Sequence, residues 1–193
     1  MKTGRVEAFS DGVLAIVITI MVLDLKVPQT TNLASLRSLL PTFFSYVLSY
    51  FYIGIYWNNH HHLFQASRHV NGRILWANLH LLFWLSLIPF VTGWMGENEF
   101  AAVPVALYGI VLLLAAIAYS ILTRALISHR ENSAVLLEAL GRDTKGKVSI
   151  LIYLLAIPLA FFISSWTACI LYGVVAAMWL VPDSRIESKL IRK

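Results

Sequence analysis

A carboxylate inside an apolar segment is the feature of this sequence best suited to chemistry. Asp11 follows Ser10 within residues 8–25, a stretch that is mostly apolar and long enough to cross a bilayer. A carboxylate at that depth is costly, so it marks either a functional site or a group that locks helices together. Histidines such as His60 and His80 exchange protons near neutral pH and bind metals. These groups would suit a proton or metal-ion transporter, or an acid–base pair of Asp11 and His60 in a membrane enzyme.

Three adjacent histidines, residues 60–62, do not have the spacing of a metal site on a helix. Neighbouring residues of a helix point about 100° apart, whereas a helical metal pair has the spacing of H-E-x-x-H. Cys169 is the single cysteine, so neither disulfides nor a cysteine metal site are available. We therefore expect no metal site and no cofactor. The sequence also lacks a P-loop and a nucleophile elbow, so we expect no enzyme, with the Asp11–His60 pair as the open alternative.

The composition is typical of an integral membrane protein. Hydrophobic residues make up 59% of the 193 residues and charged residues 13%, against roughly 25% charged residues in soluble domains. The mean hydropathy is +0.73. We predict an all-α integral membrane protein with one transmembrane domain over residues 1–193, in which Pro89 kinks the third helix. Its six predicted transmembrane helices cover residues 8–25, 39–63, 74–94, 101–123, 148–164 and 166–181.

The basic residues predict the orientation of these helices. With six spans and both termini in the cytoplasm, thirteen of the 15 Lys and Arg residues fall on the cytoplasmic side, and only Lys26 and Arg37 fall outside. This is the bias of the positive-inside rule. We therefore attribute the net charge of +5 to basic residues that orient the helices in the membrane, and we expect no nucleic-acid partner. The predicted location is the cell membrane, crossed several times.

One face of the first predicted helix is an aliphatic stripe interrupted by a single hydroxyl. At about 100° per residue, Asp11 points away from this stripe. Around a symmetry axis the stripe would form rings: apolar rings gate by dewetting, and a hydroxyl ring replaces part of an ion's hydration shell. Ordinary helix packing produces the same spacing, so both interpretations stay open at this point. The members of the stripe are Gly12, Ile16, Thr19, Ile20 and Leu23.

The motif on this helix resembles the first-helix signature of the transmembrane protein 175 family. The matching residues are Arg5, Phe9-Ser10-Asp11-Gly12, Ala15-Ile16, Thr19 and Leu23. Members of that family are potassium-permeable cation channels of bacteria and of endolysosomal membranes, and the later segments resemble a single-repeat bacterial member. The resemblance implies a homotetramer whose first helices line a central pore without a TVGYG filter. It also implies that Ile16 forms the constriction, that Thr19 contributes to potassium preference, and that Leu23 and Ile20 extend the apolar path.

The resemblance further implies a structural network around the Phe-Ser-Asp motif. It places Trp57 and His60 of the second helix, and His80 of the third, near Asp11. Hydrogen bonds and an arginine partner would keep a buried carboxylate ionised, and Arg5 of a neighbouring helix is the expected partner. The expected network is Arg5, Phe9, Ser10, Asp11, Trp57, His60 and His80.

The expected function is thus that of a potassium-permeable cation channel with a hydrophobic constriction. The expected partners are monovalent cations (K+ as the permeant ion), the lipid bilayer and further copies of the chain. A proton or metal-ion transporter that uses Asp11 and the histidines of the second and third helices is the alternative.

Overall fold

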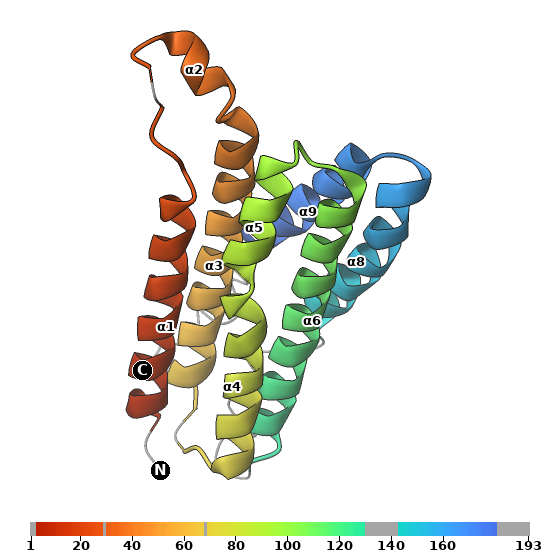
Figure 1. The fold of residues 1–193 in the computed structure, drawn as a ribbon. Helices are drawn as coiled ribbons and strands as arrows, with labels where there is room; N and C mark the ends of the chain where they lie inside the picture. The colour runs from red at the N-terminus through yellow and green to blue at the C-terminus, as the bar shows by residue number, and fades with distance from the viewer. Residues whose placement is uncertain (1–2, 29, 68, 130–142, 181–193) are drawn as a thin grey trace.

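The computed structural model describes residues 3–28, 30–67, 69–129 and 143–180, and its regular elements are α-helices (Figure 1). In chain order they are α1 (Gly4–Leu23), α2 (Leu33–Arg37), α3 (Leu40–Gln65), α4 (Gly72–Ser86), α5 (Ile88–Glu97), α6 (Ala102–Ile127), α8 (Thr144–Phe162) and α9 (Ser165–Leu180).

Four stretches of the described chain are long and apolar enough to cross a membrane: α1, the consecutive helices α4 and α5, α6, and α8. The predicted spans over residues 39–63 and 166–181 correspond to α3 and α9, which do not meet this requirement. α3 has 26 residues but carries tyrosines, asparagines and histidines, whereas α9 has 16 residues, fewer than the roughly 20 that a straight span needs.

The third predicted helix, residues 74–94, is divided into two. α4 ends at Ser86, α5 begins at Ile88, and Leu87 caps both. Pro89 lies in the first turn of α5. Proline has no N–H to donate and its ring crowds the carbonyl four residues earlier, so the helix breaks before it. The predicted kink at Pro89 is therefore an interruption at Leu87, whose backbone stays in the right-handed helical region.

The packing places α1 at the edge of the bundle. Among the described helices, α6 packs most extensively, against α4, α5, α8 and α9, whereas the main contacts of α1 are with α3, α4 and α5. Figure 1 shows α1, in red, as the outermost helix on one flank, joined to α3 by a long connection that contains α2. One side of α1 is therefore open in the single chain.

Candidate functional site

The buried face of α1 fixes the rotation of the helix. The buried residues recur every three or four positions, which is the spacing of one helical face. They are Val6, Ser10, Leu14, Val17 and Met21. A helix held along this whole face presents the residues in between to the opposite side.

The opposite face carries all four residues predicted to line a pore. In the single chain Ile16 is 58% exposed and Leu23 78% exposed, and Thr19 and Ile20 are exposed as well. Phe9, predicted as part of the network around Asp11, lies on this open face instead and is also exposed. A broad apolar face of this kind is covered by lipid or by another protein chain.

The hydroxyl of Thr19 is oriented by its own helix. Thr19 Oγ1 donates to the carbonyl oxygen of Ile16 at 2.9 Å. Because the single hydroxyl proton is used in this bond, the two lone pairs of the oxygen remain as acceptors. The exposed face of α1 therefore carries one oriented oxygen acceptor among aliphatic side chains.

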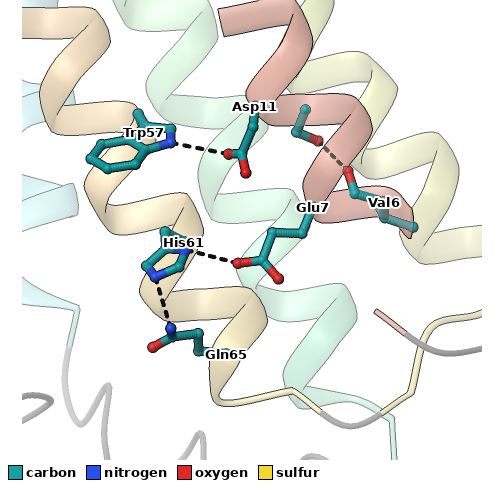
Figure 2. A network of polar contacts seen from close by, with 7 residues as sticks. Val6, Glu7, Asp11, Trp57, His61 and Gln65 are labelled. Carbon is teal, nitrogen blue, oxygen red and sulfur yellow. Dashed lines mark hydrogen bonds and ion pairs between the residues drawn. The ribbon is translucent and has the colours of Figure 1, made fainter. Parts of the chain in front are cut away.

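Asp11 and Trp57 connect α1 to α3. The indole Nε1 of Trp57 donates to Asp11 Oδ1 at 3.0 Å (Figure 2). A carboxylate that accepts from an N–H is held more strongly than a neutral acceptor. The structure thus brings together two of the residues that the family motif predicted as neighbours, and the contact ties the motif to α3.

A second, buried chain of hydrogen bonds links three helices. Asn78 Nδ2 of α4 donates to Ser10 Oγ of α1 at 2.9 Å, and His60 Nε2 of α3 donates to Asn78 Oδ1 at 2.8 Å. Ser10 Oγ in turn donates to the carbonyl oxygen of Val6 at 2.8 Å. His60 therefore reaches the motif through Asn78 and Ser10 rather than through Asp11, so the acid–base pair of His60 and Asp11 is not assembled.

Glu7 and His61 form another contact between α1 and α3, which the sequence reasoning missed. His61 Nδ1 lies 2.7 Å from Glu7 Oε1 (Figure 2). Glu7 precedes Asp11 by four positions and His61 follows Trp57 by four, and residues four apart lie on the same face of a helix. Once Asp11 and Trp57 are known to be in contact, this matched spacing indicates the contact between Glu7 and His61.

Within the described residues, the hydrogen bonds and ion pairs of Asp11 do not include His80 or Arg5. His80 is exposed and accepts a hydrogen bond from Trp84 Nε1 of its own helix at 2.9 Å. It follows Asn78 by two positions, so it points about 200° away from the buried side of α4, and its place in the network stays a prediction. Arg5 is exposed, and the ion pairs found in the described chain do not include one between Arg5 and Asp11.

The far end of α1 is bound to α5 by an ion pair. Lys26 Nζ lies 2.5 Å from Glu97 Oε1, and the hydrogen bond to Glu97 raises the pKa of Lys26. Partial burial, and then the charge of Glu97, raise the pKa of Asp24. Within the described residues, no three His, Cys, Asp or Glu side chains converge as metal ligands.

Comparison with known proteins shows the family to which this chain belongs. The family model "Endosomal/lysosomal potassium channel TMEM175" matches residues 5–89, the part that contains the contacts of α1 with α3 and α4. A protein of Chryseobacterium sp. (strain P1-3) named as a potassium channel is 55% identical over 190 residues, which cover 98% of each chain. This protein belongs to the TMEM175 family.

The TMEM175 fold extends over nearly the whole chain. The crystal structure of a lysosomal potassium-selective channel TMEM175 homolog from Chamaesiphon minutus matches with a TM-score of 0.79 and 31% identity, covering 93% of this chain and 96% of that one. The rat "Endosomal/lysosomal proton channel TMEM175" is 30% identical over 150 residues, 68% of this chain and 30% of that longer one. Family membership and the apolar helices make this TMEM175 protein a multi-pass membrane protein.

Proposed function

We propose that this TMEM175 protein is a potassium-permeable cation channel whose pore is lined by α1. The observation that carries the proposal is the division of α1 into two faces. Its buried face anchors the helix to α3 and α4, while the face with Ile16, Thr19 and Leu23 stands open in the single chain. The relatives named as potassium channels support the same assignment.

The open face suggests how ions pass. By helix rise, Ile16 and Leu23 are about 10 Å apart along α1, and Thr19 lies about 4.5 Å beyond Ile16. Rings of Ile16 and Leu23 form dry constrictions that close the pore by dewetting. The Thr19 oxygen, with its proton engaged by Ile16, offers lone pairs to a cation between them, and this ring favours K+. Ile20 extends the apolar wall.

A single chain cannot enclose this pore, because it contributes one pore-lining helix. Copies of the chain assemble around an axis, and closed rotational symmetry is the usual arrangement of identical subunits. The assembly proposed here is a homotetramer in the cell membrane, with six spans per chain, α3 and α9 included, and both termini in the cytoplasm. The distribution of Lys and Arg supports this orientation.

The constriction is tested by Ile16→Asn in liposomes that hold the purified protein. An amide at the narrowest ring keeps the pore hydrated, so we expect higher potassium leak and weaker discrimination against sodium. Ile170→Asn is the matched control, because Ile170 of α9 is 65% exposed and lies outside the proposed pore. If Ile16→Asn has the conductance and selectivity of the wild type, Ile16 is not the constriction.

A further inference from the structure

We propose that a cavity between α3, α6, α8 and α9 is a binding site for a neutral phenol. On α3, Tyr56 and Asn59 point about 150° away from Trp57 and His61, which contact α1. The cavity therefore lies on the other side of α3 from α1, and the proposal does not depend on the function of α1. The main lining residues are Tyr52, Tyr56, Asn59, Tyr119, Tyr153 and Trp179.

The cavity forms because α3 is held at a distance from α6 and α8. Among the described helices, α9 packs against α3, α6 and α8, and α6 packs extensively against α8, whereas α3 has no comparable contact with α6 or α8. Side chains bridge the space instead. Tyr119 Oη donates to the backbone carbonyl of Asn59 at 3.4 Å, and Tyr153 Oη donates to Tyr52 Oη at 3.2 Å. The empty space is about 430 Å³, its open mouth included.

The walls of the cavity are held in place by the protein itself. Tyr52 Oη donates to the carbonyl oxygen of Tyr172 at 2.7 Å, and Trp179 Nε1 donates to Ser149 Oγ at 2.9 Å. The ring of Tyr56 meets that of Tyr119 edge to face, with 6.1 Å between centroids. A preformed site binds without the cost of ordering its side chains. Its rings offer edges and faces to a further aromatic ring.

The hydroxyl of Tyr56 is the group that points to a ligand. Tyr56 is 9% exposed, and its hydroxyl has no hydrogen-bond partner within the described chain. The hydroxyls of the other three lining tyrosines donate to oxygen atoms of the protein. A buried hydroxyl without a partner is costly. We therefore expect a molecule in the cavity to accept a hydrogen bond from Tyr56.

Asn59 supplies an acceptor beside this donor. It follows Tyr56 by three positions, which places both on one face of α3. Its Nδ2 donates to the carbonyl oxygen of Ile55 at 2.8 Å, so its Oδ1 remains as an acceptor. The hydroxyl of a phenol matches both groups, because its oxygen accepts from Tyr56 and its proton is donated to Asn59. An alkyl chain leaves both groups unsatisfied, and a water molecule leaves the aromatic walls uncovered.

The charge of the lining favours a neutral ligand. None of the described residues that line the cavity is charged, and a charge taken out of water without a partner is costly. Lys145 Nζ lies 5.8 Å from the ring centroid of Trp179, but Lys145 is not part of the described lining. A phenol titrates near pH 10, as the side chain of tyrosine does, so it is neutral at pH 7.

The first test is the binding of 4-fluorophenol to the purified full chain in detergent at pH 7, followed by fluorine NMR. We expect a saturable bound signal that phenol displaces. Ala116→Leu places a larger side chain in the cavity lining and should abolish the signal. Ala177→Leu, at an exposed alanine of α9, is the control and should keep it. No saturable signal in the wild type, or an equal signal in Ala116→Leu, overturns the proposal.

The second test removes the hydroxyl without filling the cavity. Fluorobenzene lacks the phenol hydroxyl and should bind the wild type about fivefold more weakly than 4-fluorophenol, as the loss of a hydrogen bond implies. In Tyr56→Phe this difference should fall to about twofold, whereas Tyr50→Phe, at an exposed tyrosine, should keep it. Equal binding of the two probes to the wild type would show a cavity for any apolar group. That result, or an undiminished difference in Tyr56→Phe, overturns the proposal.

Discussion

Replacing Trp57 by Phe tests the contact between α1 and α3 with the smallest change of shape. Phenylalanine keeps an aromatic ring beside His61 but removes the Nε1–H that donates to Asp11 Oδ1 at 3.0 Å. Hydrogen bonds to charged groups contribute about 1.5–3 kcal/mol. Trp57 is 45% exposed, so water replaces part of the lost bond and the expected cost is about 1.5 kcal/mol. That energy corresponds to about a tenfold change in an equilibrium constant.

The assay is amide hydrogen exchange of α1 in detergent-solubilised protein. Trp57→Phe should raise the opening equilibrium of the amides around Asp11 about tenfold, because the hydrogen bond that holds this turn to α3 is gone. In the background of Asp11→Asn the same substitution should cost less, since a neutral acceptor binds the indole more weakly. Trp76→Phe is the control, at a tryptophan of α4 that is 76% exposed. Equal exchange in Trp57→Phe and Trp76→Phe refutes the idea that this hydrogen bond anchors α1.

Two further substitutions probe the packing and charge near the C-terminal end of α1. Gly96→Ala should destabilise the protein by about 1–3 kcal/mol, because the added Cβ would lie 2.6 Å from Thr42 Cα. Gly54→Ala is the control and should not destabilise it, because a Cβ there would have nothing within 4 Å. Equal unfolding temperatures of the two variants would contradict a close contact between α5 and α3 at Gly96. Asp24→Asn should raise the unfolding temperature at pH 7, since a raised pKa in the folded state means that ionised Asp24 opposes folding. The gain should vanish at pH values well below 3.8, where Asp24 is protonated in the folded and in the unfolded state, and a gain that persists there would contradict this reasoning.

Helical periodicity made the two faces of α1 predictable from the sequence. A step of about 100° per residue puts Ile16, Thr19 and Leu23 on one side, and the structure leaves that side open while it buries Ser10 on the other. The assignment of His80 rested on residue type rather than on helical position. The step from Asn78 to His80 turns the side chain away from the buried side of α4, and Asn78 takes the place beside Ser10.

The contact between Glu7 and His61 was missed for a different physical reason. A glutamate near a helix start resembles a solvated carboxylate, and of the three adjacent histidines only His60 is predicted to lie near Asp11. Two residues four apart on one helix can contact two residues four apart on another helix only if the two helices are in the right register. That register is set by tertiary packing, which the sequence does not show. The tyrosines and histidines of α3 lower its hydropathy below that of the other long helices, although the apolar residues between them predict a span over residues 39–63.

The most direct test of a pore along α1 is potassium uptake into liposomes, with sodium as competitor, by the wild type and Thr19→Ala. Ser86→Ala is the matched control, because Ser86 Oγ is also exposed and donates to the carbonyl oxygen of Phe83 at 2.7 Å, as Thr19 does to that of Ile16. A channel lined by α1 predicts potassium uptake by the wild type, a reduced preference for potassium in Thr19→Ala, and no change in Ser86→Ala. Wild-type protein that moves protons or divalent metal but no potassium, or an unchanged preference in Thr19→Ala, would contradict it.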